Sequence, residues 1–243
     1  MNAIPGGSSD VRDLPAAVTV ARADTPHGEV ALRRRGDVLE LVVDGAFAMD
    51  TVDTSTEVAL AERALGGHPS PHRVLVGGLG LGMTARAVLA DPRVRHVDVV
   101  ELAGPLVGWA RSGLVPELSG LEGERCTLHV ADVLDVLAGT SGPPGPWDAV
   151  LLDVDNGPDF LVHASNAPLY TPKGLAAARA VVRPGGLLAV WSSHLAPALL
   201  EALAQVALDG DEVTEDVVEV QREHRSFRYA LYSLALASST LRG

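Results

Sequence analysis

Short apolar stretches and longer amphipathic stretches alternate along most of the chain. Apolar runs with the length of buried strands occupy residues 74–77, 97–101, 127–130, 149–153 and 187–191. Stretches with helical periodicity cover residues 84–89, 105–111, 133–137, 172–182 and 196–207. Because strands separated by helices form right-handed βαβ units, this alternation predicts a parallel sheet with helices on both faces.

The two ends of the chain have a different pattern. Residues 213–220 and 227–236 are consecutive strand-like runs without a helix between them, which predicts an antiparallel hairpin at one sheet edge. Near the start, residues 28–35 and 38–44 form a second predicted hairpin with Gly36-Asp37 as its turn, and residues 46–49 could add a short strand. We therefore expect an α/β, Rossmann-like fold with a mostly parallel seven-stranded sheet, an antiparallel C-terminal hairpin and a small N-terminal β-hairpin module. This is the arrangement of class I S-adenosylmethionine (SAM)-dependent transferases.

The same pattern divides the chain into three parts. Residues 1–15 are rich in Gly, Ser, Asp and Pro and are expected to be a disordered tail. Residues 16–52 are expected to form the small N-terminal β module, and residues 53–243 the Rossmann-like SAM-binding catalytic domain. Within the latter, Thr54 and Glu57 have the spacing of a capping box that opens a helix through Ala64.

Composition narrows the range of partners. The 243 residues carry a formal net charge of -12, which argues against nucleic acid and is compatible with a cationic small substrate. No apolar run approaches the length of a membrane-spanning helix, so we expect a cytoplasmic protein with no membrane partner. No metal is expected, because Cys126 is the single cysteine and prolines separate His68 from His72.

A glycine-rich turn follows the first apolar run of this alternation. Its glycines Gly78, Gly80 and Gly82 let the backbone approach a ligand closely, in front of the next helix. Acidic residues end the following strands. Glu101 can accept hydrogen bonds from ribose hydroxyls, and Asp132 can reach the exocyclic amine of an adenine.

Asp153 ends the fourth strand and completes this set. Because all four features lie at carboxyl ends of parallel strands, they predict one nucleoside site, and their order favours a SAM-type nucleoside. The glycines alone leave a nicotinamide cofactor open, since Gly80, Gly82 and Ala85 also fit the dinucleotide pattern.

Seven stretches between residues 38 and 192 resemble the polyamine aminopropyltransferases, the spermidine synthase family. They are residues 41–45, 74–82, 91–101, 129–132, 147–153, 169–172 and 183–186. The resemblance implies transfer of an aminopropyl group from decarboxylated SAM to an amine. It also implies that Asp153 is the base that deprotonates the attacking ammonium, and it makes Asp155 and Tyr170 further catalytic candidates.

Three features differ from the family pattern. The glycine turn lacks the Asp that holds the donor's free amine, the family's Tyr-His-Glu is Ser55-Thr56-Glu57, and the family's Asp-Ser-x-Asp-Pro is Asp153-Val-Asp155-Asn-Gly-Pro158. These departures leave open whether SAM or decarboxylated SAM is the donor, and hence whether a methyl or an aminopropyl group moves.

The stretch between residues 153 and 170 is too long for an ordinary strand-to-helix turn and is expected to lie across the acceptor site. We predict Glu57, Asn156 and His163 as substrate-binding residues. The residues Trp109, Trp147 and Trp191 are expected to fill the core.

We therefore predict a spermidine-synthase-like transferase that alkylates a small, amine-bearing acceptor, with a polyamine as one candidate, and forms a homodimer. The alternatives are a methyltransferase that acts on an unrelated small molecule, and a non-catalytic nucleoside-binding scaffold or regulatory protein.

Overall fold

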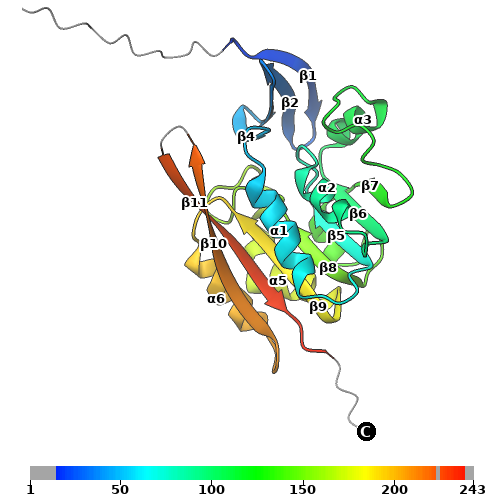
Figure 1. The fold of residues 1–243 in the computed structure, drawn as a ribbon, viewed down its shortest axis with the longest axis vertical. Coiled ribbons are helices and arrows are strands. Elements are labelled where there is room, and N and C mark those ends of the chain that lie inside the picture. Colours follow the sequence, from blue (N-terminus) through cyan, green and yellow to red (C-terminus); the bar gives the residue numbers. More distant parts are fainter. Residues whose placement is uncertain (1–14, 223–224, 239–243) are drawn as a thin grey trace, which may run out of the picture.

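A seven-stranded sheet forms the centre of the molecule (Figure 1). The computed structural model describes residues 15–222 and 225–238. Five strands are parallel: β5 (Arg73–Gly77), β6 (His96–Glu101), β7 (Cys126–Val130), β8 (Trp147–Leu152) and β9 (Val182–Ser192). The antiparallel strands β10 (Glu212–Arg222) and β11 (Arg225–Ala235) complete the order β10-β11-β9-β8-β5-β6-β7. The predicted mostly parallel sheet with an antiparallel C-terminal hairpin is confirmed.

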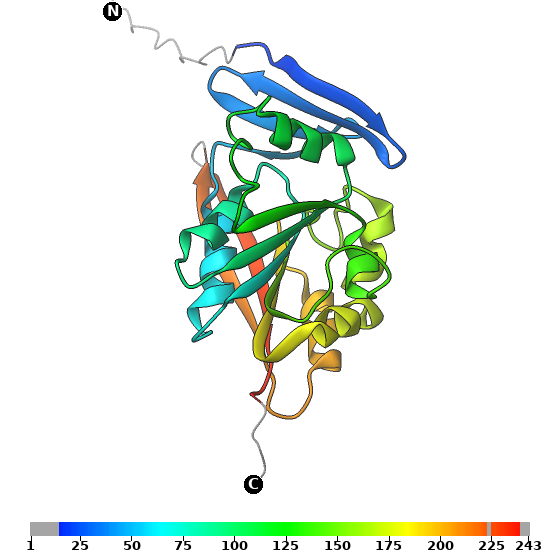
Figure 2. The same cartoon turned by 90° about the vertical axis from the view of Figure 1, so that its right-hand side faces the viewer.

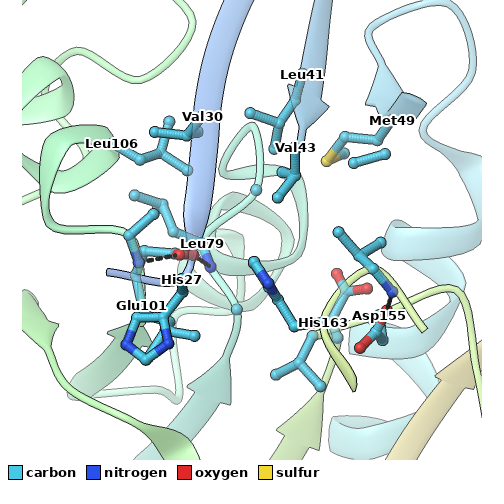
Figure 3. A pocket seen from close by; sticks show the side chains of 18 of the residues that line it. His27, Val30, Leu41, Val43, Met49, Leu79, Glu101, Leu106, Asp155 and His163 are labelled. Carbon is cyan, nitrogen blue, oxygen red and sulfur yellow. Dashed lines mark hydrogen bonds between the residues drawn. The ribbon is translucent and has the colours of Figure 1, made fainter. Parts of the chain in front are cut away.

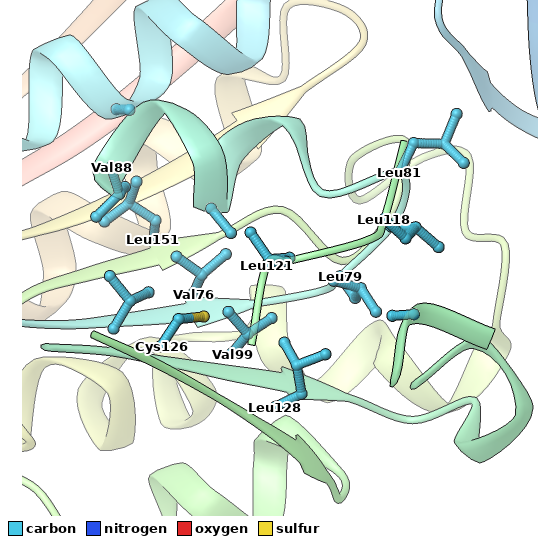
Figure 4. Close-up of a cluster of buried hydrophobic side chains, with 14 of the residues drawn as sticks. Val76, Leu79, Leu81, Val88, Val99, Leu118, Leu121, Cys126, Leu128 and Leu151 are labelled. Atoms are coloured by element: carbon cyan, nitrogen blue, oxygen red, sulfur yellow. The ribbon is translucent and has the colours of Figure 1, made fainter. Parts of the chain in front are cut away.

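Helices cover both faces of this sheet because alternate residues of each buried strand point to opposite sides. On one face, α1 (Ser55–Gly66), α2 (Met83–Ala90) and α3 (Gly104–Ser112) pack on side chains such as Val76 and Val99 (Figure 4). On the other face, α4 (Val133–Leu137), α5 (Pro172–Ala180), α6 (Pro197–Val206) and the 3-10 helix η1 (Ala164–Tyr170) pack on residues such as Leu75 and Val150. Each face therefore has its own apolar core.

A second, four-stranded antiparallel sheet precedes α1. Its strands β1 (Val18–Thr25), β2 (Gly28–Arg35), β3 (Val38–Val43) and β4 (Ala46–Asp50) pair in sequence order. Figure 2 shows this sheet lying across the end of the large sheet at which its parallel strands finish. The N-terminal module thus contains two strands beyond its predicted hairpin, one of which, β1, has no counterpart in the sequence prediction. Most of β1 is exposed or half-buried at the sheet edge, so its apolar pattern is weak.

Two local predictions differ from the structure. Thr54 is the N-cap of α1, but its side chain makes no capping hydrogen bond, so the predicted capping box is wrong. Glu57 is instead buried and accepts a hydrogen bond from the Thr56 hydroxyl at 2.7 Å. Residues 183–186, between the predicted helix 172–182 and the predicted strand 187–191, are instead part of β9, at a shift in its register with β8.

The predicted tail, residues 1–15, falls almost entirely outside the described residues. The division at residue 52 stays a prediction. In the described part of the chain, no helix is both long enough and apolar enough to cross a membrane.

Strand order fixes the place where a ligand can bind. From β5 the chain adds β6 and β7 on one side, and then returns to add β8 and β9 on the other. The crevice outside the carboxyl ends of β5 and β8 is therefore the topological switch point of the sheet, where open α/β sheets bind ligands.

Candidate functional site

A central pocket lies at this switch point, between the large sheet and the N-terminal sheet (Figure 3). Its floor includes Gly78, Glu101 and Asp153 from the carboxyl ends of three strands. Its roof includes Val30, Leu41, Val43 and Met49 from the N-terminal sheet. With Gly80, which also lines it, the pocket brings together four of the predicted nucleoside-site residues.

The glycine turn is built for close backbone contact. Gly78, Gly80 and Gly82 have φ values of 94°, 50° and 79°, which side-chain-bearing residues rarely adopt. The Gly78 N–H donates to the Val100 carbonyl at 2.8 Å, and a Cβ on Gly78 would lie 2.0 Å from the Asp153 carbonyl oxygen. Gly82 caps α2 and does not line the pocket, so only the first two predicted glycines face it.

The alternating leucines of the same turn hold it in place. Leu79 and Leu81 are buried in the core beneath α2, where Figure 4 shows them among the side chains of that cluster. The Leu81 N–H points to the Met49 sulfur at 3.3 Å, so β4 also contacts the turn. The turn thus anchors Leu81 in the core, whereas Gly78, Leu79 and Gly80 line the pocket.

Glu101 is fixed by backbone donors. Its Oε1 accepts from the Ala103 N–H at 2.7 Å and its Oε2 accepts from the Leu79 N–H at 2.9 Å. Burial raises the pKa of Glu101, and the two backbone hydrogen bonds oppose this effect. Each carboxylate oxygen retains a lone pair for a further donor such as a ribose hydroxyl.

Asp153 follows β8 directly and lines the central pocket. Its N–H donates to the Gly77 carbonyl at 2.8 Å, and its Oδ2 accepts from the Thr84 hydroxyl at 2.6 Å. Burial raises the pKa of Asp153 to about 7, the charge of Glu57 acts in the same direction, and the Thr84 hydrogen bond opposes both. Such a group changes protonation state near neutral pH, as a general base requires.

The segment after β8 crosses one side of the pocket. Asp155, Asn156 and His163 line it, and the buried Asp155 ties the segment together. Its Oδ1 accepts from the backbone N–H of Val162, and its Oδ2 accepts from the Asn166 amide at 2.7 Å. Asp155 is therefore held by its own loop, and burial raises its pKa.

Tyr170 lies behind this segment. It is buried and does not line the central pocket. Burial raises the pKa of its hydroxyl, and the charges of Asp155 and Asp153 add to the increase. The hydroxyl therefore stays protonated near neutral pH, so Tyr170 cannot act there as a base.

Asp132 lies in a narrow cleft that continues from the central pocket. Gly78, Glu101 and His163 line both spaces. Asp132 is the N-cap of α4, and its Oδ1 accepts from the Leu134 N–H at 2.8 Å. Asp132 thus lines this cleft together with Glu101, whereas Glu57 does not line it.

A side hollow opens from the opposite end of the central pocket. Its walls carry the carboxylates of Asp50, Asp53 and Glu57. Among the described residues that line the hollow, none is basic. The hollow shares Met49, Glu57, Asn156 and Trp191 with the central pocket, so the two spaces are continuous. Negative charge and continuity with Asp153 suit a cationic ligand.

Several residues that line the pocket, or that bond to a residue lining it as Thr84 does to Asp153, were not predicted from the sequence. Met49 belongs to a short strand, and Thr84 is the second residue of a helix, so neither had a distinguishing local signal. His27, in the turn between β1 and β2, faces His163 with 6.4 Å between the ring centroids. Trp147 is fully buried as expected, whereas the partly buried Trp191 lines both the pocket and the hollow.

Sequence comparison relates the chain to polyamine aminopropyltransferases. It is 32% identical over 182 residues to the "Polyamine aminopropyltransferase" of Mycobacterium tuberculosis strain H37Rv, covering 74% of this chain and 34% of that protein. It is 37% identical over 162 residues to "Polyamine aminopropyltransferase 2" of Streptomyces coelicolor, covering 64% of this chain and 27% of that protein. The chain thus spans about a third of the length of these relatives. No protein-family model matches it.

Comparison with solved structures also relates the chain to spermidine synthases. A spermidine synthase in complex with the transition-state analogue AdoDATO matches with a TM-score of 0.73 and 16% identity, covering 92% of this chain and 75% of that one. The spermidine synthase of Thermotoga maritima matches with a TM-score of 0.70 and 15% identity, covering 92% and 74%. At such low sequence identity, these structural matches establish a shared fold only. Together with the sequence relatives, they confirm the resemblance drawn from the sequence motifs.

Proposed function

We propose that this chain, a homologue of the polyamine aminopropyltransferases, transfers an aminopropyl group from decarboxylated SAM to a primary amine. The observation that carries the proposal is the position of Asp153, a carboxylate with a pKa near neutrality between a nucleoside-type pocket and an acidic hollow. The names of the sequence relatives support the same reaction class.

The donor nucleoside is assigned to the central pocket and the narrow cleft. Glu101 would accept hydrogen bonds from the ribose hydroxyls, because its carboxylate is already oriented by Leu79 and Ala103. Asp132, farther along the cleft, would accept a hydrogen bond from the adenine amine. This arrangement directs the sulfonium end of the donor toward Asp153.

The acceptor amine is assigned to the side hollow. An ammonium ion has no lone pair, so it must lose a proton before it can attack. Asp153 takes that proton, and the nitrogen lone pair then attacks the propyl carbon that is bonded to sulfur. The new C–N bond forms as the C–S bond breaks, its electrons return to sulfur, and the products are methylthioadenosine and the extended amine.

The glycine turn, residues 78–82, lacks the Asp with which the resembled family holds the donor's free amine. Two carboxylates in the same pocket compensate for this change in our proposal. Glu57 is close enough for its charge to raise the pKa of Asp153, and Asp155 lines the pocket beside it. The donor's propylammonium would lie among these three carboxylates, which favours decarboxylated SAM over SAM, whose carboxylate they would repel.

Product analysis tests this proposal directly. Purified protein is incubated with decarboxylated SAM, or with SAM, and a panel of primary amines, and the products are identified by mass spectrometry. We expect an aminopropyl increment on at least one amine, formed together with methylthioadenosine. Asp153→Asn should lower kcat by roughly 10²- to 10⁴-fold, the usual contribution of a general base, whereas Asp37→Asn, in the exposed β2–β3 turn, should not.

Other outcomes would contradict the proposal. A methyl increment from SAM, with none from decarboxylated SAM, would assign the chain to methyl transfer. Nucleoside binding by calorimetry without any product would support the scaffold alternative.

A further inference from the structure

We infer that the acceptor is a primary amine with an aromatic body, an arylalkylamine, in preference to a linear polycation. The inference rests on the proposed function and names the class of amine that the side hollow accepts. It comes from the composition of the hollow's walls, which differs strongly from that of the rest of the chain.

Aromatic residues are concentrated around this one space. The whole chain contains only three Phe, three Trp and three Tyr. Four of these nine line the side hollow: Phe47, Phe160, Trp191 and Tyr229. They come from four separate segments, namely β4, the segment after β8, β9 and β11, so the concentration is produced by tertiary structure.

The rings at the mouth of the hollow are left open to solvent. Phe47 is 51% exposed and Phe160 is 63% exposed. Deeper in, the rings of Trp191 and Tyr229 lie 5.7 Å apart with an interplanar angle of 35°. Aromatic faces arranged around a cleft bind another ring by stacking or edge-to-face contact, and its burial also removes their apolar surface from water.

The carboxylates of the hollow differ in their depth and in the elements that they contact. Asp50 accepts from the Val52 N–H at 2.9 Å, and Asp53 accepts from the Ser55 N–H at 2.9 Å and the Ser55 hydroxyl at 2.6 Å. These two side chains therefore organise the turn before α1. Glu57 lies deeper, is 7% exposed and lines the central pocket together with Asp153.

The hollow thus has an acidic inner end and aromatic walls. An arylalkylamine would place its amine nitrogen next to Asp153 and its ring between Phe47, Phe160 and the Trp191–Tyr229 pair. A linear diamine would cover the rings only with its narrow methylene chain and would need Asp50 or Asp53 for its second ammonium. The two classes of acceptor therefore depend on different residues.

Amine selectivity and matched variants test the inference. We compare 2-phenylethylamine with 1,4-diaminobutane as acceptors, using kcat/KM with decarboxylated SAM and calorimetric binding in the presence of methylthioadenosine. We expect 2-phenylethylamine to have the higher kcat/KM and the tighter binding. Phe47→Leu and Phe160→Leu should each weaken its binding by roughly threefold to tenfold, the value of one aromatic contact.

Phe227→Leu is the matched control. Phe227 is the third phenylalanine of the chain and is 42% exposed, but it does not line the hollow. Its replacement should change neither amine's binding. All three positions are exposed, so leucine should fold normally at each of them.

The outcomes separate this inference from the proposed function. If 1,4-diaminobutane is the better substrate and binder, and Asp50→Asn weakens it while Phe47→Leu and Phe160→Leu do not, the arylalkylamine inference is wrong and aminopropyl transfer stands. If no primary amine of the panel is extended, the proposed function fails. In that case, tighter binding of 2-phenylethylamine that depends on Phe47 and Phe160 would still support the aromatic site, and equal or weaker binding would overturn it.

Discussion

A Cβ on Gly78 would lie 2.0 Å from the carbonyl oxygen of Asp153. The close approach of the Gly78 backbone to the Asp153 backbone joins the glycine turn after β5 to the end of β8. It therefore sets the distance between the nucleoside-binding turn and the candidate base. Because the neighbouring atom is backbone, it cannot rotate away. The glycine therefore determines the geometry of the site as well as the conformation of its own turn.

Gly78→Ala should damage both stability and the site. The substitution combines a positive φ of 94° with overlap against the Asp153 backbone, and we expect a loss of at least about 4 kcal/mol in the free energy of unfolding. Gly45→Ala is the matched control, because Gly45 has a φ of 78° and a Cβ added there would meet no atom within 4 Å. It should cost only roughly 1–2 kcal/mol. Equal losses in chemical denaturation would contradict a steric role for Gly78.

The pH dependence of the reaction should follow Asp153. The pKa of Asp153 is raised to about 7, so kcat/KM should increase as the pH rises through this value and the carboxylate loses its proton. Its raised pKa has the opposite effect on stability, because the folded state binds the proton more tightly than the unfolded state. This contribution to stability is complete below the ordinary Asp pKa and is lost as the pH rises through about 7. Asp153→Asn should remove both dependences.

Thr84 should help to set the pH at which kcat/KM rises. Its hydroxyl donates to Asp153 Oδ2 at 2.6 Å and thereby favours the ionised form. Thr84→Val keeps the shape but removes the donor, so the rising limb of kcat/KM should move by roughly one pH unit to more alkaline values. Thr84→Ser retains a hydroxyl and should restore the original midpoint. An unchanged midpoint in Thr84→Val would show that Thr84 does not set the pKa of the base.

Glu101 should control nucleoside affinity. Glu101→Gln replaces one acceptor oxygen by an NH₂ group that faces the N–H of Leu79 or Ala103, and so disorganises the side chain. We expect methylthioadenosine to bind roughly 10- to 100-fold more weakly by calorimetry, equivalent to about 1.4–2.8 kcal/mol. Glu124→Gln, at an exposed position, should leave the affinity unchanged. Similar affinities for both variants would remove Glu101 from the site.

Asp98 should contribute to stability without affecting the site. It is buried in β6, where its Oδ2 accepts from Arg73 and from the Trp147 indole, each at 2.9 Å, and its Oδ1 contacts His129 at 3.0 Å. Asp98→Asn should lower the free energy of unfolding by about 3 kcal/mol, because it leaves the partly buried Arg73 cation uncompensated. Glu122→Gln, which breaks the more exposed pair with Arg111, should cost about 1 kcal/mol or less.

The contribution of Asp98 to the free energy of unfolding should decrease in acid. Burial opposes ionisation of Asp98, but the hydrogen bonds from Trp147 and His129 and the charge of Arg73 lower its pKa overall. Its contribution is therefore present above the ordinary Asp pKa and is lost as the pH falls through the lowered value. Denaturation curves of the wild type and Asp98→Asn should converge in acid. A constant difference at every pH would contradict this assignment.

The site could be predicted only in part from the sequence. Glu101, Asp132 and Asp153 follow apolar runs, so their places at the carboxyl ends of strands could be predicted from local pattern. The prediction that Glu57 caps a helix is wrong. A glutamate at this spacing can either cap a helix or line a pocket, and the position of the N-terminal sheet decides between these two roles. The stabilising role of Asp98 could not be predicted from its local sequence, because its partners come from three other strands.

The sequence by itself determined the order of strands and helices, the glycine turn and the acidic residues that follow the strands. These features depend on periodicity and backbone preference, which act over a few residues. Only the tertiary structure decided that Met49 and the N-terminal sheet cover the pocket, and that Phe47, Phe160, Trp191 and Tyr229 surround one hollow. Those residues are far apart in the chain, and the packing of the two sheets, which no local pattern encodes, brings them together.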